Sequence, residues 1–282
     1  METSPSSEFV VQFWGVRGSV PSPGKDTVRY GGNTSCVEMR IAGKRLIFDG
    51  GTGLRMLGKS LEPSQPVEAY WFFTHYHWDH IQGVPFFTPA FVEGNTLHIH
   101  GAAPEGVGMA KHFCERVLHM NSPVPIKAIE ADLKFYDIVC GDTMTLDDIT
   151  IETGRLNHPN GAMGYRVTWQ GHSAFYCTDT EHFPDRLDEN VLHLARDADI
   201  IIYDAMYTDE QYNNPKTPKQ GWGHSTWQEG VKVAKEVGVK QLAIFHHEPN
   251  HTDDVLDQIE LEVKDAFTGG FLAREGMIRR LI

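Results

Sequence analysis

The sequence lacks the features of a membrane or exported protein. No apolar run in its 282 residues approaches the roughly 18 residues that span a bilayer. Residues 1–8 carry neither the basic region nor the apolar stretch of a signal peptide. We therefore expect residues 1–8 to form a disordered lead-in, the protein to be cytoplasmic, and no membrane to be a partner.

Cysteine is scarce as well. The four cysteines are far apart in the sequence, and no two of them form a C-x-x-C pair; they are Cys36, Cys114, Cys140 and Cys177. This spacing argues against a thiolate zinc site and against a thiol redox motif. We expect four reduced thiols.

Positive charge is also in short supply. There are 25 Lys and Arg residues against 38 Asp and Glu, which gives a net charge of −13, and the basic residues are scattered. This balance argues against a protein that coats nucleic-acid backbones, so we expect no stable nucleic-acid partner. Histidine, by contrast, occurs 15 times, which invites a search for metal ligands.

Short runs rich in Val, Ile, Phe and Tyr, bounded by turn residues, predict strands. These runs are 9–14, 36–42, 45–48, 68–73, 96–100, 149–153, 164–168, 174–177, 200–203 and 241–245. Helices are predicted between them, at 52–60, 106–119, 187–195, 226–237 and 254–267. The helix beginning at Thr226 has a capping-box pattern, because Glu229 follows three residues later.

The order strands, helix, strands occurs twice, with a break near 140–144. It predicts an α/β fold in which two sheets pack face to face with helices outside. Residues 9–282 are then expected to form a single domain with two similar halves. The polar segment 208–222 predicts a mobile loop.

The densest chemical signal directly follows the predicted strand 68–73. It is His75-Tyr76-His77-Trp78-Asp79-His80, with four ligand-type side chains in six residues. In an extended stretch His75 and His77 point to the same side, because side chains alternate along such a chain. A turn into a short helix would direct Asp79 and His80 toward a second position, so this spacing can serve two metal ions.

Three further ligand-type residues lie where a predicted strand meets a loop. His158 precedes one strand, Asp179 follows the strand 174–177, and His246 follows the strand 241–245. A lone His or Asp at a strand end is usually a cap or turn residue. Together with the first cluster, however, these residues supply the imidazoles and the carboxylate that a two-metal site needs.

These motifs resemble the metallo-β-lactamase superfamily of binuclear hydrolases, over nearly the whole chain from Phe13 to about Asp254. The most similar branch is that of tRNase Z and related cyclic nucleotide phosphodiesterases. The segments that carry this placement are Phe13-Trp14-Gly15-Val16-Arg17-Gly18-Ser19-Val20-Pro21, Asn33-Thr34-Ser35-Cys36, Phe48-Asp49-Gly50-Gly51-Thr52-Gly53, Gly164-Tyr165-Arg166, Gly223-His224-Ser225-Thr226 and Phe245-His246-His247-Glu248-Pro249. The resemblance implies a four-layer αββα sandwich.

The resemblance also implies two divalent metal ions, zinc in the first place and manganese as the alternative. One ion would bind His75, His77 and His158, and the other would bind Asp79, His80 and His246. Asp179 would bridge them together with a water or hydroxide. Asp49 would orient a ligand histidine, and Asp79 is counted with the catalytic residues.

His224 is implied to donate a proton to the leaving group, although it can also merely cap the helix at Thr226. Its partner would be Asp204, where tRNase Z has a Glu in a His-Glu-Ala-Thr segment. Ser35, Tyr207 and His247 are expected around the ligands or against the substrate. His247 either lines the substrate pocket or faces solvent, and His251 has no assigned role.

The function predicted first is hydrolysis of small cyclic nucleotides such as cAMP or cGMP, which agrees with the negative charge. The alternative is a tRNase Z-like 3′-processing endoribonuclease, for which a basic track and a protruding basic arm are expected and not found. A hydrolase of a thioester, lactone or lactam is a third possibility. A nucleotide-binding protein without activity is disfavoured, because all seven ligand positions are filled. The resemblance further implies a homodimer.

Overall fold

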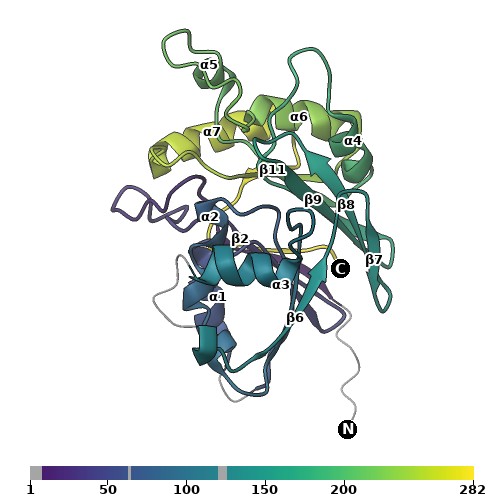
Figure 1. Ribbon diagram of the computed structural model, residues 1–282. Helices are drawn as coiled ribbons and strands as arrows, with labels where there is room; N and C mark the ends of the chain where they lie inside the picture. The colour runs from purple at the N-terminus through teal and green to yellow at the C-terminus, as the bar shows by residue number, and fades with distance from the viewer. Residues whose placement is uncertain (1–7, 63–64, 120–125) are drawn as a thin grey trace. The chain divides into compact units, whose positions relative to one another are not determined.

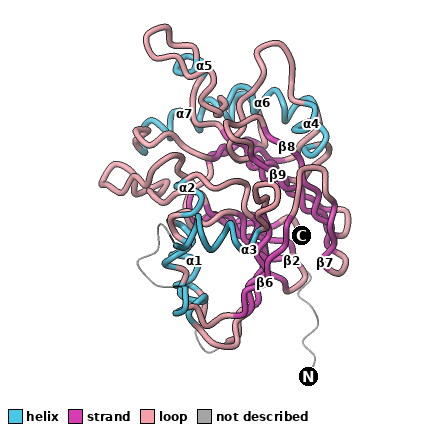
Figure 2. The backbone as a smooth tube through the Cα atoms, viewed as in Figure 1, coloured by secondary structure: helices cyan, strands magenta, loops and turns pink. Residues whose placement is uncertain are grey.

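The computed structural model describes residues 8–62, 65–119 and 126–282 (Figure 1). Residues 1–7 of the expected lead-in lie outside this range. The chain divides into two compact units: the first contains residues 1–15, 33–139 and 275–282, and the second contains residues 16–32 and 140–274. Each unit is built on one sheet with its own helices, as the strand and helix colouring of Figure 2 shows.

The sheet of the first unit has the strand order β14-β1-β2-β3-β4-β5-β6. Its strands are β1 (Phe9–Gly15), β2 (Cys36–Ile41), β3 (Lys44–Phe48), β4 (Glu68–Phe72), β5 (Thr96–Gly101), β6 (Asp132–Asp137) and β14 (Ile278–Arg280). From β3 to β6 neighbouring strands are parallel, and from β14 to β3 they are antiparallel. The parallel strands therefore end at the same edge, where ligand-type side chains are expected.

The core of the first unit follows from alternation along β4. Ala69, Trp71 and Phe73 point to one face of the sheet and are buried with Leu54 and Leu57 of α1 (Gly53–Ser60). The remaining helices of this unit are short; they are α2 (Trp78–Ile81), η1 (Val84–Phe86), η2 (Thr88–Phe91), α3 (Met109–His112), the π-helix η3 (Phe113–His119) and η4 (Ile126–Ala128).

The sheet of the second unit has the order β13-β12-β11-β10-β9-β8-β7. Its strands are β7 (Thr143–Leu146), β8 (Ile149–Leu156), β9 (Ala162–Trp169), β10 (His172–Cys177), β11 (Ile200–Asp204), β12 (Gln241–Phe245) and β13 (Gly270–Leu272). The strands from β10 to β13 run parallel, so β10, β11 and β12 also end at one edge. The functional segments that follow them start from that edge.

Helices α4 (Glu189–Ala195), α6 (Trp227–Glu236) and α7 (Asp253–Ala266) cover one face of this second sheet (Figure 1). Val231 and Ala234 of α6 and Ile259 of α7 are buried there against alternate residues of β11 and β12. The Thr226 hydroxyl accepts a hydrogen bond from the Glu229 amide at 3.3 Å and so caps α6. No helix among the described residues is both long and apolar enough to cross a membrane.

All ten predicted strands and five predicted helical regions are present, with ends that shift by a few residues. The sequence missed β6, β7, β13 and β14. Charged side chains interrupt β6, and the last two strands have three residues each, too few to show alternation. The expected break near 140–144 lies beside the crossing from the first unit to the second at residue 140, but the exchange of residues 16–32 and 275–282 was not predicted.

The loop prediction for residues 208–222 is wrong at the start of the segment, where the chain is helical. The segment begins with a helix, α5 (Asp209–Tyr212), closed by a full capping box. The Gln211 amide donates to the Thr208 hydroxyl at 3.2 Å, and the Thr208 amide donates to the Gln211 side chain at 3.0 Å. Both orphan groups at the start of the helix are thereby satisfied, so a polar composition is compatible with order.

His100 shows how the first sheet uses a histidine for packing. Its ring lies between Phe72 and Tyr136, at ring-centroid distances of 4.5 and 4.6 Å. Nδ1 donates to the His98 carbonyl at 3.1 Å. Burial lowers the pKa of His100 to about 4, because the charged ring would lose its water. His100 is therefore a packing residue of the first sheet.

This burial predicts acid sensitivity. The pKa of His100 is about 4 in the folded state and about 6.5 in the unfolded chain. The unfolded chain therefore binds the proton first, and stability is lost as the pH falls from about 6.5 to about 4. Replacing His100→Phe keeps a ring in the stack and should reduce the drop in unfolding free energy between pH 7 and 5 by about 2 kcal/mol. Urea denaturation of both proteins at the two pH values measures this, and equal drops would contradict it.

Candidate metal centre

The first unit supplies a donor cluster directly after β4. His77 is extended, with φ −67° and ψ 154°, and α2 begins at the next residue. The chain thus turns into a short helix where the sequence predicts it, and Asp79 and His80 lie in that helix. His75, Asp79 and His80 are buried, so these polar groups must find polar or metal partners.

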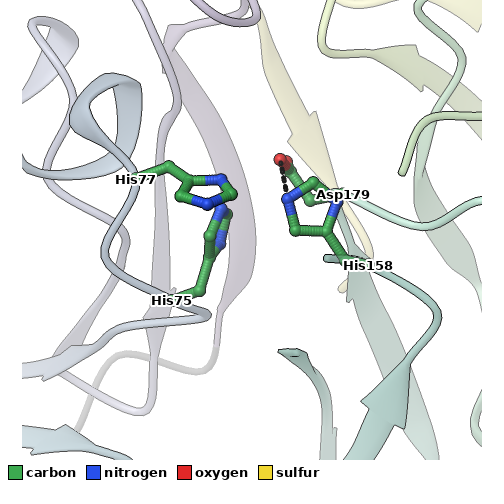
Figure 3. Close-up of side chains that lie close together, drawn as sticks. All are labelled: His75, His77, His158 and Asp179. Carbon is green, nitrogen blue, oxygen red and sulfur yellow. Dashed lines mark ion pairs between the residues drawn. The ribbon is translucent and has the colours of Figure 1, made fainter. Parts of the chain in front are cut away.

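In this cluster the His75 imidazole contacts two others. The His75 ring lies 4.5 Å from the His77 ring and 4.3 Å from the His80 ring, measured between centroids. Figure 3 shows His75 and His77 side by side. His80 Nε2 is 3.4 Å from Asp79 Oδ2. Four metal-type donors therefore gather in one place within the first unit.

Asp49 orients two of these rings. Its carboxylate accepts hydrogen bonds from the Thr74 amide at 2.8 Å, from the Thr74 hydroxyl at 2.9 Å and from His80 Nδ1 at 2.8 Å. The Thr74 hydroxyl in turn lies 3.0 Å from His75 Nδ1. Both histidines therefore carry their proton on Nδ1, which makes Nε2 the nitrogen with the lone pair that a metal needs.

The second unit contributes a carboxylate between two imidazoles. Asp179 Oδ2 lies 3.5 Å from His158 Nε2, and Asp179 Oδ1 lies 3.2 Å from His246 Nε2. Figure 3 draws the ion pair between His158 and Asp179. Each oxygen thus faces a different ring, which is the arrangement of a carboxylate that can bridge two cations.

A backbone carbonyl orients His158. Its Nδ1 donates to the Gly223 carbonyl at 2.8 Å, which directs Nε2 toward Asp179. Burial lowers the pKa of His158, and the Asp179 charge opposes this effect. A neutral ring is the form that binds metal, so the low pKa favours ligation.

His224 is held by Asp204. Its Nδ1 lies 2.9 Å from Asp204 Oδ2, and Asp204 also accepts from the Thr180 and Met206 amides at 3.1 and 3.2 Å. The structure assigns the cap of α6 to Thr226 itself, so capping does not account for His224. Asp179, Asp204, His224 and His246 each offer a donor atom within 4.8 Å of the others.

Three site residues adopt a left-handed backbone. The φ angles are 58° at Asp49, 55° at Asp179 and 60° at His246. Each residue comes one or two positions after the end of a strand, β3, β10 or β12. Such conformations cost on the order of 1–3 kcal/mol and persist where the surroundings impose them. The strain turns each side chain out of the strand and into the donor cluster.

The structure corrects the expectation for His247. Its ring is buried, donates from Nε2 to the Ala273 carbonyl at 2.8 Å and meets Tyr30 edge-on, and burial lowers its pKa to about 3. A ring enclosed in this way does not face solvent. His251 is also buried, with Nε2 2.7 Å from Gln211.

Tyr207 and Ser35 are both buried. Tyr207 lies edge-on to His224 at 6.4 Å, and burial together with Asp204 raises its pKa. The Ser35 carbonyl accepts from the Gly51 amide at 2.9 Å. Its hydroxyl makes no hydrogen bond to any described residue.

Three residues that position the site were not predicted from the sequence. Thr74 contacts His75, Glu181 accepts a hydrogen bond from the Gly223 amide, and Gly18 lies against His246. Thr74 and Glu181 stand one and two residues from predicted ligands, so proximity within the motifs was the available signal. Gly18 lies in the N-terminal motif, whose structural reason now emerges. A Cβ there would lie 2.5 Å from His246 Nδ1, so only glycine lets this segment pass the ring.

Comparison with known proteins agrees with these observations. A family model described as a beta-lactamase superfamily domain matches residues 33–247. Ribonuclease Z of Methanosarcina mazei is 27% identical over 86% of this chain and 88% of its own length. Ribonuclease Z of Enterococcus faecalis is 23% identical over 91% of this chain and 92% of its own length.

Solved structures show the same fold. The metallo-beta-lactamase fold protein YhfI from Bacillus subtilis has a TM-score of 0.73 at 20% identity, covering 98% of this chain and all of that one. The short form of human tRNase Z has a TM-score of 0.68 at 21% identity, covering 97% and 99%. The predicted metallo-β-lactamase type of αββα fold is confirmed.

Gly223 provides a test of the metal ligands. A Cβ at Gly223 would lie 2.3 Å from His158 Nδ1, whereas one at Gly221 would meet nothing within 4 Å. Both glycines are left-handed, with φ +85° and +82°. Gly223→Ala should therefore displace His158 and lower the zinc content per chain. Gly221→Ala should lower the unfolding free energy by about 1–2 kcal/mol, the cost of a left-handed alanine, and should leave the metal content unchanged.

Elemental analysis after zinc-replete expression measures the metal content. Thermal unfolding measures the loss of stability that both variants share, because each places an alanine at a left-handed position. Equal metal contents in the two variants would contradict the role of His158.

Proposed function

The chain belongs to the metallo-β-lactamase superfamily, in its tRNase Z branch, and from this membership we propose that it is a metal-dependent phosphodiester hydrolase. The observation that carries the proposal is the Asp179 carboxylate, whose two oxygens face His158 Nε2 at 3.5 Å and His246 Nε2 at 3.2 Å. A buried carboxylate between two imidazoles suits a bridge between divalent cations.

The two donor sets are proposed to hold two ions. One ion takes His75, His77 and His158, the other takes Asp79, His80 and His246, and Asp179 bridges them. Nitrogen and carboxylate donors fit zinc, with manganese as the alternative. The fixed Nδ1 protons of His75, His80 and His158 support this assignment, because they leave Nε2 as the donor in each ring.

When bound, two divalent ions supply Lewis acidity, which neutralises phosphate charge and makes water a nucleophile near neutral pH. The protein's part is to hold its donors still. Asp49 fixes the ring of His80, and the Gly223 carbonyl fixes the ring of His158. Little reorganisation is then needed when a substrate arrives.

His224 is proposed as the proton donor to the leaving oxygen. Asp204 accepts from its Nδ1 at 2.9 Å, so Nε2 is the nitrogen that can carry a proton to the substrate. The carboxylate stabilises the charged ring and holds its tautomer. Asp204 is one methylene shorter than Glu, yet it reaches His224, so the departure from the tRNase Z pattern does not break this pair.

RNA is the substrate class proposed first. The curated relatives in Methanosarcina mazei and Enterococcus faecalis are ribonucleases by name, and each aligns with most of this chain. This reverses the order of the sequence-based prediction, in which cyclic nucleotides came first. The names of the curated relatives support RNA, whereas the net charge supports cyclic nucleotides.

A small phosphodiester such as cAMP is the second candidate. The observation that favours it is the net charge of −13, because a long RNA must overcome repulsion from an acidic surface. A homodimer stays a prediction of the family resemblance, and a cytoplasmic location stays a prediction from the sequence itself.

A substrate panel tests the proposal. Purified protein loaded with zinc or manganese is assayed on precursor tRNA, cAMP, cGMP, bis(p-nitrophenyl) phosphate and a chromogenic cephalosporin. We expect cleavage of precursor tRNA and of the nitrophenyl diester. Chelation should abolish both activities, and added zinc or manganese should restore them, because the donors cannot activate water alone. Turnover of the cephalosporin alone would overturn the phosphodiesterase assignment, and turnover of cAMP without tRNA would select the second candidate.

His224→Ala tests proton donation. The variant should lower kcat on RNA by about 10²- to 10⁴-fold, because an alkoxide leaving group needs a proton. Hydrolysis of bis(p-nitrophenyl) phosphate should fall much less, since nitrophenolate leaves without protonation. Metal content should equal that of the wild type. Equal losses on both substrates, or a loss of metal, would show that His224 acts on the fold or as a ligand.

A further inference from the structure

An exposed aromatic residue and a lysine are held together in the loop that precedes His224. Lys219 Nζ lies 3.9 Å above the centroid of the Trp222 ring and 5.5 Å from that of the Tyr207 ring. Trp222 is 56% exposed, whereas Tyr207 is buried. The Lys219 ammonium thus contacts both the buried Tyr207 ring and the solvent-exposed Trp222 indole.

Glu181 fixes this loop. Its carboxylate accepts hydrogen bonds from the Tyr212 hydroxyl at 2.6 Å, the Gly221 amide at 2.7 Å and the Gly223 amide at 2.8 Å. The Lys219 amide also donates to the Tyr212 carbonyl at 3.1 Å. Three charge-assisted bonds to one carboxylate hold both ends of the segment 212–223, so its side chains are ordered before any ligand binds.

The same loop is tied to the candidate site of the second unit. The Gly223 carbonyl accepts from His158 Nδ1 at 2.8 Å, and Gly223 follows Trp222 directly. The Tyr207 ring that contacts Lys219 also lies edge-on to His224, at 6.4 Å between centroids. The Tyr207 ring therefore connects Lys219, and with it Trp222, to the proposed proton donor His224.

These two side chains have complementary chemistry for a nucleotide. An ammonium binds a phosphate oxygen, and an exposed indole offers a face on which a base can stack. Of the six tryptophans only Trp78 and Trp222 are exposed. Trp222 is the one with a cation at its ring, and it stands on a loop that Glu181 anchors.

We propose that Lys219 and Trp222 form a nucleotide subsite beside His224, with Lys219 binding a phosphate and Trp222 stacking the adjacent base of the substrate. The proposal rests on the proposed phosphodiesterase function and names the residues that recognise the leaving side of the scissile bond. Tyr207 serves as a positioning residue that holds the lysine.

Steady-state kinetics on a base-containing substrate test the subsite. Trp222→Ala and Lys219→Ala should each raise KM about tenfold, since stacking on an aromatic side chain and a phosphate contact are lost. Lys216→Ala is the matched control, because it removes the same charge from the same exposed loop and should leave KM unchanged. On an RNA substrate with an abasic nucleotide on the leaving side, Trp222→Ala should match the wild type. Equal KM changes in the Lys216 and Lys219 variants would reduce the effect to general charge and overturn the subsite.

A binding measurement separates this proposal from the hydrolase proposal. AMP is titrated into zinc-loaded protein while tryptophan fluorescence is recorded. Quenching should persist in Trp78→Phe and disappear in Trp222→Phe. The opposite pattern would place the base at Trp78 and overturn the proposal. Quenching through Trp222 in a protein that cleaves no diester would keep the subsite and reject the enzyme, whereas cleavage without quenching would reject only the subsite.

Discussion

The convergence of two imidazoles on one buried carboxylate is the constraint on which the second unit is built. Asp179 faces His158 at 3.5 Å and His246 at 3.2 Å. To present these groups, the chain takes a left-handed turn after β10 and again after β12. Gly18 and Gly223 are the consequence, because a side chain at Gly18 would collide with the His246 ring and one at Gly223 with the His158 ring. These two glycines therefore leave space for the His246 and His158 rings, which is a separate requirement from the conformation of the turns.

The buried charge around this constraint is tolerated because the two orienting carboxylates, Asp204 and Asp49, each accept several hydrogen bonds. Asp204 accepts from two amides and from His224, and Asp49 accepts from Thr74 and His80. An unpaired buried carboxylate would shift to its neutral form or destabilise the fold. Backbone amides at strand ends thus satisfy the orienting groups, and the imidazole Nε2 atoms remain directed at the cluster. The parallel strands supply these amides, since their ends lie along one edge of each sheet.

Features of the site that depend on neighbouring residues in the sequence could be predicted from local patterns, whereas those that depend on residues far apart in the sequence could not. The cluster from His75 to His80 and the strands before each ligand are local patterns, so they were found. Asp49 and Asp204 were predicted through a family resemblance, because nothing local tells that they reach rings 31 and 20 residues away. Glu181 was missed for the same reason: its three donors come from residues 212–223, and only the folded loop brings them to one carboxylate. The burial of His247 was not predicted, because attention went to its neighbour His246, although adjacent side chains point in different directions.

The net charge of −13 is a weaker guide to the substrate than it first appears. Exposed charges more than about 10 Å apart are largely screened at physiological salt, so a phosphate responds to the groups beside it. In the second unit several acidic groups of the site are already engaged, Asp204 with amides and His224, and Glu181 with the 212–223 loop. On that loop the Lys219 ammonium lies beside the Tyr207 and Trp222 rings. An acidic protein can therefore present a locally cationic and aromatic surface to a nucleotide. The overall charge argues against a protein that coats long nucleic acids, but it is compatible with one that binds a single phosphate and its base.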